Sequence, residues 1–494
     1  MKSITNYFCK ILFTLLDNYI IVVYNTRNAV LRGFIMSERN LVSQKKNPIQ
    51  LSDHFTYKRL LKFTFPSIIM MVFTSIYGVI DGIFVSNFVG VDQFNAINFI
   101  MPYLLIIGAV GFMFGTGGCA LIAKTLGEGD KEKANSLFSL LIYLPAVIGI
   151  IISALGLIFI RPVATLLGGT GLMLENAVTY GSVFLIGNAF YMLQVEFQSF
   201  FVTAEKPRLG LFFTVLSGVT NIILDALFVA IFKWGLVGAA FATITSQAIG
   251  AILPIIYFAR KNSSLLKLGK TKFDGHAIIQ ACLNGSSELM TNISLSLVGM
   301  LYNFQLMKYY FTDAQGFNDG VSAYGVLMYV NFIFISVFIG YAVGSSPIVS
   351  YNFGANRKDE LKGILRKSLV IIGIISLLMF GLSELLAHPM ATIFVSSDCE
   401  VFELTKHAFI ICSLSFIFVG FSIYGSSFFT ALNNGPVSAA ISFLRILVFQ
   451  MVAVIVLPLF FGGEGIWWSV VVAEVMALFV TFTFIFAKRK KYGY

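Results

Sequence analysis

The stretch that decides the fold is FPSIIMMVFTSIYGVIDGIFVSNFVG, residues 65–90. It is a long apolar run that contains one ionisable residue, Asp81. About 20 consecutive apolar residues are enough for a helix to span the hydrocarbon core of a bilayer. A charge at that depth is unfavourable by roughly 3 kcal/mol on insertion scales, so it usually faces a cavity or a partner. The stretch therefore predicts a membrane helix with a functional acid. The alternative is that Asp81 only hydrogen-bonds a neighbouring helix.

The composition of the whole chain is typical of a polytopic membrane protein. Of its 494 residues, 57% are hydrophobic and only 12% are charged, whereas soluble domains contain about 25% charged residues. The five cysteines are scattered without metal-binding or disulfide spacing, and no catalytic motif is present, so we expect no enzyme and no cofactor. The net charge of +10 indicates no nucleic-acid partner, because the basic residues lie in short loops beside apolar runs.

The apolar runs predict an all-α protein with about twelve transmembrane helices. Connections after even-numbered spans are rich in Lys and Arg, and those after odd-numbered spans are poorer. Because cytoplasmic loops carry the excess of Lys and Arg, both termini are expected in the cytoplasm. The expected spans are residues 64–90, 94–124, 134–160, 176–203, 208–232, 235–260, 276–308, 321–351, 363–388, 402–431, 437–461 and 465–487.

An internal repeat groups these spans into two lobes. GGCALIAKTLGEGDKEKA, residues 117–134, aligns with GSSPIVSYNFGANRKDEL, residues 344–361, at an offset of 227 that superimposes Gly127 on Gly354. Two further pairs of segments repeat at offsets of up to 230. Because the offset covers six spans, the two six-helix lobes are expected to be related by a pseudo-two-fold axis along the membrane normal.

The repeat also predicts the boundaries of the domains. Residues 64–260 form the N-terminal lobe and residues 276–487 the C-terminal lobe, joined by a cytoplasmic loop at residues 261–275. Residues 1–63 form a cytoplasmic N-terminal extension, and residues 488–494 a basic cytoplasmic tail. Whether residues 1–35 are part of the native protein stays open, because Met36 is an alternative start.

Polar side chains inside the spans are the candidate site. In the N-terminal lobe, Asn221 and Asp225 share one face of span five, and Thr243 lies in span six. With Asp81 they offer the oxygen ligands that a hard cation such as Na⁺ prefers, and a buried acid pair also favours binding of a proton. The sequence leaves Na⁺, at Asp81, Asn221 and Asp225, and H⁺ both open.

Candidate substrate-binding residues in the N-terminal lobe are Asp81 itself and Tyr77, which share a helical face. In the C-terminal lobe, Asn284, Glu288 and Asn292 follow one another at intervals of four in span seven. This polar stripe is expected to face a central cavity. The alternative for Glu288 is a role in helix packing near the membrane face.

With these residues the chain resembles the multidrug and toxic compound extrusion (MATE) transporters over about residues 56–488. The resemblance lies in the two six-helix lobes, VIDGIFVS at residues 79–86, the loops at Gly127 and Gly354, and GSSELMTN at residues 285–292. It implies a bacterial plasma-membrane exporter of cationic drugs and dyes, driven by inward flow of H⁺ or Na⁺. Span ten departs from some members of the family, because it contains no aspartate.

The resemblance also implies roles for single residues. Asp81 matches the aspartate of the first span that binds the coupling ion in the family, and Asn221, Asp225 and Thr243 match its cation site in the N-terminal lobe. Glu288 matches the acid at the start of span seven. A monomer is expected. The alternatives are a related flippase for lipid-linked saccharides, which the acidic cavity disfavours, and an ion channel, which the two-lobe repeat disfavours.

Overall fold

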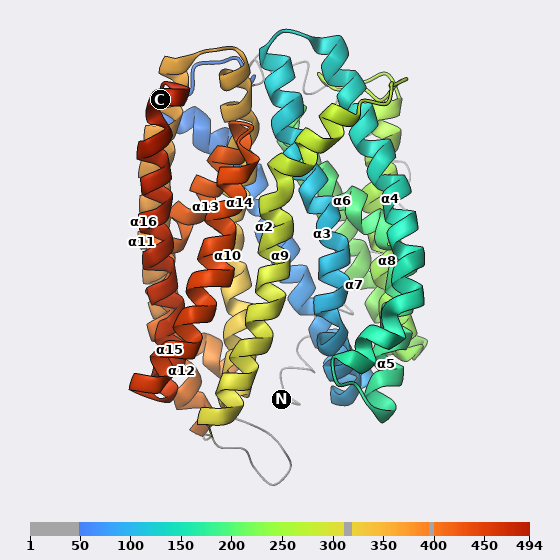
Figure 1. Ribbon diagram of the computed structural model, residues 1–494. Helices are drawn as coiled ribbons and strands as arrows, with labels where there is room; N and C mark the ends of the chain where they lie inside the picture. Colours follow the sequence, from blue (N-terminus) through green and yellow to red (C-terminus); the bar gives the residue numbers. More distant parts are fainter. Residues whose placement is uncertain (1–48, 311–318, 395–399) are drawn as a thin grey trace. The chain divides into compact units, whose positions relative to one another are not determined.

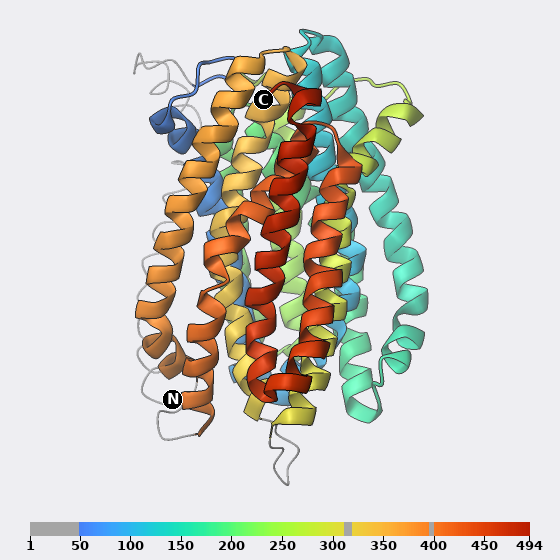
Figure 2. The same cartoon turned by 60° about the vertical axis from the view of Figure 1, so that its left-hand side comes forward.

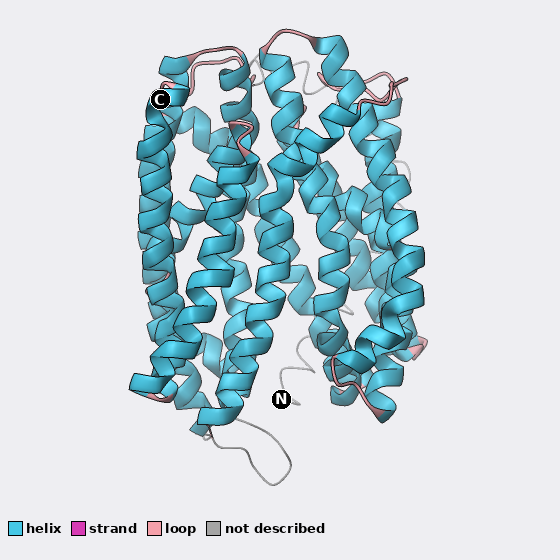
Figure 3. Ribbon diagram, in the orientation of Figure 1, coloured by secondary structure: helices cyan, strands magenta, loops and turns pink. Residues whose placement is uncertain are grey.

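The computed structural model describes residues 49–310, 319–394 and 400–494, and residues 50–494 form one compact unit. The described residues contain helices and loops and no strand (Figure 3). The predictions about residues 1–48 lie outside the described residues. The helices of the first half are α2 (Tyr57–Phe84), η1 (Val85–Val89), α3 (Val91–Gly127), α4 (Lys131–Leu166), α5 (Gly171–Ile186), α6 (Asn188–Thr203), α7 (Pro207–Asp225), η2 (Ala226–Ile231) and α8 (Gly235–Ala259).

The second half has the same kind of architecture and follows the linker of residues 260–274. Its helices run alongside those of the first half, and α11 and α16 extend along most of the bundle (Figures 1 and 2). They are α9 (Gly275–Tyr309), α10 (Asp319–Gly354), α11 (Lys358–Phe394), α12 (Glu400–Ser413), α13 (Phe416–Ala431), α14 (Gly435–Phe443), η3 (Leu444–Gln450), α15 (Met451–Phe461) and α16 (Gly463–Tyr492).

Every predicted span corresponds to a helix or to a broken helix. In the described part of the chain, nine helices are long and apolar enough to cross a membrane, or up to eleven if each of two bent pairs counts as one span. The remaining predicted span is α9, whose 35 residues are ample in length. Its hydropathy is lower because it contains the polar residues that the sequence analysis singled out, among them Asn284 and Glu288.

Several helices extend beyond their predicted spans, and two of them, α2 and α16, also cross the predicted domain boundaries. Helix α2 begins at Tyr57, and the Thr56 side chain caps it by accepting a hydrogen bond from the Arg59 backbone N–H. Residues 57–63, predicted as part of the extension, are therefore helical. Helix α16 continues to Tyr492 through the basic tail. The positive charges in its last turn interact favourably with the negative end of the helix dipole.

Two predicted spans are bent, and the bends are repeated between the lobes. Helices α5 and α6 meet at 59° around Gly187, and the helices on either side of Leu414 and Ser415 meet at 51°. Spans five and eleven also share an irregularity, because π-helical turns interrupt both at η2 and η3. Their sequences alone gave no sign of these interruptions.

Backbone conformation supports the predicted repeat independently of side-chain identity. Residues with positive φ recur at matching places in the two halves: Gly129 with Asn356, Glu205 with Asn433, and Lys233 with Gly462. These pairs lie 227, 228 and 229 residues apart, which are the offsets of the sequence repeat. The two halves therefore repeat their turns as well as their helices, as expected for two lobes of common architecture.

The connections rich in Lys and Arg gather at one end of the bundle. We call it the basic end; it carries the loops of residues 128–130, 204–206, 260–274 and 355–357 and the C-terminus (Figure 1). At this end α3 and α10 approach so closely that only glycine fits. A Cβ at Gly127 would lie 2.1 Å from the Tyr351 carbonyl oxygen, and one at Gly354 would lie 2.1 Å from that of Lys124.

A second glycine contact joins the lobes one step further along the bundle. A Cβ at Gly117 of α3 would lie 2.0 Å from the carbonyl oxygen of Ala281 in α9, and one at Gly285 of α9 would lie 1.9 Å from that of Met113. A Cβ at Gly340 of α10 would likewise lie 2.5 Å from the Ile68 Cα in α2. Backbones this close bury both helices against each other, so the lobes are held together by packing of α2 and α3 on α9 and α10.

The segment of residues 50–56, which we call the strap, directly precedes α2 in the chain and lies at the basic end. On the N-terminal lobe, the Leu51 backbone N–H donates to Glu205 Oε1 at 2.6 Å. On the C-terminal lobe, Arg357 Nη1 donates to the Ser52 carbonyl oxygen and Lys367 Nζ to that of Phe55, both at 2.7 Å, and His54 pairs with Glu360. Leu51 and Phe55 are fully buried. The strap therefore contacts both lobes.

Candidate functional site

The predicted residues of the N-terminal lobe lie on three helices that pack together. Helix α7 packs against both α2 and α8. In α7, intervals of four residues place Ser217, Asn221 and Asp225 on one face, and all three are buried. Asp81 of α2 and Thr243 of α8 are half-buried. The face of α7 is polar and inside the protein, which is unusual for a membrane helix and typical of a functional surface.

The centre of this group is a pair of acids. The carboxyl groups of Asp81 and Asp225 contact each other. Among the described residues, no hydrogen-bond donor reaches Oδ1 of Asp81 or either carboxyl oxygen of Asp225, and the Asn221 amide nitrogen also lacks a partner. Two adjacent carboxylates away from water cannot both stay ionised without compensation. The pair is therefore suited to take up a cation, either a proton or a metal ion.

Two side chains that the sequence analysis missed complete this group. The Tyr180 hydroxyl of α5 lies near the Thr243 side chain and in the electrostatic field of both acids. Gln194 of α6 contacts the Tyr77 hydroxyl, and its Nε2 donates to Ser217 Oγ at 3.1 Å. Gln194 and Gln198 are four residues apart in α6, so a shared polar face was a signal in the sequence, whereas the partners of Tyr180 and Gln194 lie on other helices and could not be read from spacing.

Thr243 already uses its hydroxyl proton within its own helix. Its Oγ1 donates to the Ala239 carbonyl oxygen at 3.0 Å, so the lone pairs of the oxygen face the site. In the described residues, no group of three or more His, Cys, Asp or Glu side chains could hold a metal ion. A Na⁺ ion would therefore need the two carboxylates together with amide and hydroxyl oxygens, such as those of Asn221 and Thr243.

Both acids lie directly beside a π-helical turn. The segment η2 begins at the residue after Asp225, and η1 begins four residues after Asp81, whose carbonyl oxygen accepts the Val85 N–H. The third segment, η3, contains Arg445. Short π-helical turns are rare and occur often at functional sites. Each of the three alters the register of its helix where a membrane-embedded charge is placed.

The C-terminal lobe contains a different arrangement of charges. Arg445 Nε donates to both carboxyl oxygens of Glu474, at 2.8 and 3.0 Å, and the pair is almost completely buried. Glu288 of α9 lies in the field of Arg445 but forms no ion pair with it. It lies 13 residues beyond the first residue of α9, which places it deep in the bundle and not near its face.

The predicted stripe in span seven is divided by the structure. Asn284 is buried, and its Nδ2 donates to Asn433 Oδ1 at 2.6 Å, so its amide is used to hold the loop between α13 and α14. Asn292 Nδ2 donates to the Glu288 carbonyl oxygen at 2.8 Å, which leaves its oxygen open. Of the three residues expected to face a cavity together, Glu288 and Asn292 are half-exposed and Asn284 is not.

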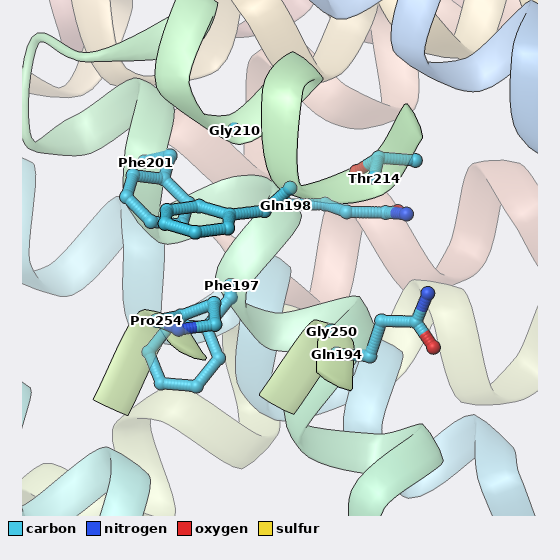
Figure 4. A pocket seen from close by; sticks show the side chains of 9 residues that line it. Gln194, Phe197, Gln198, Phe201, Gly210, Thr214, Gly250 and Pro254 are labelled. Atoms are coloured by element: carbon cyan, nitrogen blue, oxygen red, sulfur yellow. The ribbon is translucent and has the colours of Figure 1, made fainter. Parts of the chain in front are cut away.

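Two cavities among the described residues are small. One lies between α6, α7 and α8, holds about 10 Å³ and is lined by Gln194, Gln198 and Thr214 among apolar side chains (Figure 4). This is room for roughly one water molecule. Another, of about 40 Å³, lies in the C-terminal lobe beside Tyr302, Tyr324 and Trp467. Neither has the volume of a drug-sized ligand.

Comparison with known proteins identifies the family. The MatE family model matches residues 66–227 and 289–456. The multidrug export protein MepA of Staphylococcus haemolyticus is 25% identical over 438 residues, which are 88% of this chain and 94% of that protein. MepA of Staphylococcus aureus strain NCTC 8325 is 24% identical over 458 residues, 92% of this chain and 98% of that one.

A solved structure has the same fold. A multidrug resistance MATE transporter of the MOP superfamily, in an outward-facing conformation, superimposes with a TM-score of 0.83 at 21% identity, and the match covers 91% of this chain and all of that one. The predicted fold of about twelve transmembrane helices in two lobes is confirmed. The chain belongs to the MatE family of multidrug and toxic compound extrusion transporters.

Proposed function

We propose that this protein exports lipophilic cationic drugs and dyes across the bacterial plasma membrane in antiport with H⁺ or Na⁺. The observation that carries the proposal is the buried contact between Asp81 and Asp225, whose carboxyl oxygens lack donors among the described residues. The names of the MepA relatives support export of several drugs. The exchange of a cation at the acids for a cationic substrate follows from their charge.

The proposed cycle uses the acid pair as its switch. A coupling cation binds Asp81 and Asp225, with Asn221 and Thr243 supplying further ligands if the ion is Na⁺. Binding neutralises the carboxylates and so weakens the field that holds a lipophilic cation, which then leaves. When the ion is released to the other side, the ionised acids attract the next substrate molecule. Coupling of this kind requires the two ligands to have opposite preferences for the two states.

The membrane potential contributes to this exchange. Inward movement of one positive charge through 100 mV supplies about 2.3 kcal/mol. The basic loops, the strap and the C-terminus share one end of the bundle, which supports a cytoplasmic location for that end and for the C-terminus. In this orientation the glycine contacts between α3 and α10 at the basic end hold the two lobes together on the cytoplasmic side. One chain contains both lobes, in accord with function as a monomer.

Substrate binding is proposed to involve side chains of both lobes. Tyr77 and Asp81 lie on adjacent turns of α2, so an aromatic face and a carboxylate are offered together to a lipophilic cation. In the C-terminal lobe, Glu288 and Asn292 present a carboxylate and an amide oxygen. Asn284 is left out of this set because its side chain is held by Asn433.

The test is transport by purified protein in vesicles, with Na⁺ and pH gradients imposed separately. Efflux of a cationic dye should follow one of the two gradients and should be lost in Asp225→Asn and Asp81→Asn. Asp130→Asn, the same chemical change at an exposed loop position, where the asparagine oxygen can still accept the Lys133 N–H, serves as a matched control and should leave efflux unchanged. Full gradient-driven efflux by Asp81→Asn would overturn the coupling assignment.

A further inference from the structure

We infer that the outer face of α11 at the basic end binds the headgroup of an anionic phospholipid through Lys362 and Arg366. This face takes no part in the proposed transport cycle, and its role does not depend on the coupling ion or on the drug. The observation behind it is a difference between α11 and its counterpart in the N-terminal lobe, α4.

The repeat pairs the two helices residue by residue. Helix α4 begins at Lys131 and α11 at Lys358, 227 residues later, which is the offset of the sequence repeat. The residues at intervals of four along each helix share one face. The same offset pairs three positions on that face: Asn135 with Lys362, Ser139 with Arg366, and Tyr143 with Val370.

In the N-terminal lobe the linker between the lobes covers this face. Asn135 Oδ1 accepts the Lys267 backbone N–H at 2.7 Å, and Ser139 Oγ accepts the Gly269 N–H at 3.0 Å. The Tyr143 hydroxyl donates to the Gly269 carbonyl oxygen at 3.3 Å. All three side chains on this face of α4 therefore hold a segment of the protein's own chain.

In the C-terminal lobe the matched face is uncovered in the described part of the chain. Lys362, Arg366 and Val370 are exposed, and no described residue forms an ion pair or hydrogen bond with either cation. The cations next to them differ, because Arg357 and Lys367 donate to the strap. Two positive charges therefore replace the polar side chains that bind the linker in the other lobe.

Further along α11 the same face becomes apolar. Val370, Ile374 and Leu377 are 44%, 55% and 63% exposed, and α11 lies at the outside of the bundle, packed on α10, α12 and α13 (Figure 2). Its 37 residues form about 55 Å of helix, whereas the hydrocarbon core of a bilayer is about 30 Å thick. The first turns of α11 therefore extend into the headgroup region, where lipid phosphates lie.

Charge favours an anionic lipid over other occupants of this face. Lys362 and Arg366 are about 6 Å apart along the helix, so one phosphate group can accept hydrogen bonds from both. A zwitterionic headgroup adds a cation that these residues repel, whereas clusters of Lys and Arg at a membrane surface attract anionic lipids. Residues 1–48 contain more Lys and Arg than Asp and Glu, so their charge opposes binding here.

Quenching of tryptophan fluorescence by brominated lipids tests the inference. Val370→Trp places a reporter one helical turn beyond Arg366, and the signal of the native tryptophans is subtracted with the protein that lacks this reporter. Full-length protein is reconstituted in mixtures of phosphatidylcholine and phosphatidylglycerol, with one of the two brominated. Phosphatidylglycerol should bind at the reporter about fivefold or more tightly than phosphatidylcholine. Lys362→Gln combined with Arg366→Gln should bring the two affinities within about twofold.

Two matched controls separate a specific site from the general charge of the basic end. Lys267→Gln combined with Lys270→Gln removes two exposed cations from the linker and should leave the preference at Val370→Trp unchanged. Tyr143→Trp places the reporter at the matched position of α4, beside the linker, and should show affinities for the two lipids within about twofold. Lys362→Gln alone carries the test if the double variant does not fold, and should lower the preference.

Equal affinity for the two lipids at Val370→Trp would overturn the inference and would mean that another segment of the chain, or no specific ligand, occupies the face. A preference that persists without Lys362 and Arg366, or an equal preference at Tyr143→Trp, would also overturn it. Because no gradient is imposed, failure of the proposed antiport would appear separately, as absence of gradient-driven transport with lipid binding intact.

Discussion

Replacing Gly127 by alanine is predicted to open the basic end of the transporter. A Cβ at this position would lie 2.1 Å from the Tyr351 carbonyl oxygen and 2.9 Å from the Ala355 nitrogen, whereas ordinary contacts begin at 3.4 Å. Both opposing atoms belong to backbone and cannot turn aside, so α3 and α10 must separate. Overpacking of this kind destabilises a packed arrangement by about 1–3 kcal/mol.

The magnitude converts into populations of the two states. Because the contact exists only while the lobes are closed at this end, the destabilisation shifts the equilibrium toward the open form by a factor of about 5–150. Gly354→Ala should act equally, since its Cβ would lie 2.1 Å from the Lys124 carbonyl oxygen. The population shift in the double variant should be smaller than the sum of the shifts in the two single variants, because either methyl group separates the same two helices.

The assay is the distance between spin labels placed on the two lobes at the basic end. Labels replacing Glu132 and Asp359, both exposed, should report a longer-distance population in Gly127→Ala and Gly354→Ala. Gly325→Ala lies in the same helix as Gly354, and its added Cβ would meet nothing within 4 Å. It should leave the distances unchanged. Distances in Gly127→Ala that match those of Gly325→Ala would refute the reasoning.

Three further predictions follow from contacts at the basic end and in the C-terminal lobe. Arg357→Ala combined with Glu360→Gln removes two contacts of the strap to the C-terminal lobe, and hydrogen exchange of residues 50–56 should rise by about tenfold or more; unchanged exchange would contradict the role of the strap. Burial raises the pKa of Glu205 above its ordinary value of 4.5, while the Leu51 N–H opposes the shift. The stability that Glu205 contributes in its protonated form is therefore fully present below pH 4.5 and is lost as the pH rises through the raised pKa. Between these two pH values, the thermal midpoint of the unaltered protein should fall relative to that of Glu205→Gln. Arg445→Ala leaves Glu474 buried without a partner and should destabilise the protein by about 3–5 kcal/mol in thermal unfolding, whereas Arg445→Gln with Glu474→Gln should cost much less.

The membrane class, the spans and the repeat could be predicted from the order of the residues alone. A bilayer requires about 20 apolar residues for each helix, and this requirement is met along the chain without reference to neighbours. Asp81, Asn221 and Asp225 could be recognised in the same way, because each is a polar residue within an apolar run. The interval of four residues between Asn221 and Asp225 also places them on one face of their helix. Even the lower hydropathy of α9 was visible in its asparagines and Glu288.

Which polar groups contact each other depends on how the helices pack, and this could not be predicted. Asp81 and Asp225 are 144 residues apart in the sequence, and their contact, like that of Arg445 with Glu474, depends on the order in which helices pack. Asn284 lies on the predicted polar face, but its side-chain amide donates a hydrogen bond to Asn433 in the loop between α13 and α14. Hydrophobicity and periodicity are properties of one helix, whereas the partner of a buried polar group is set by the neighbouring helix, which the sequence of neither specifies.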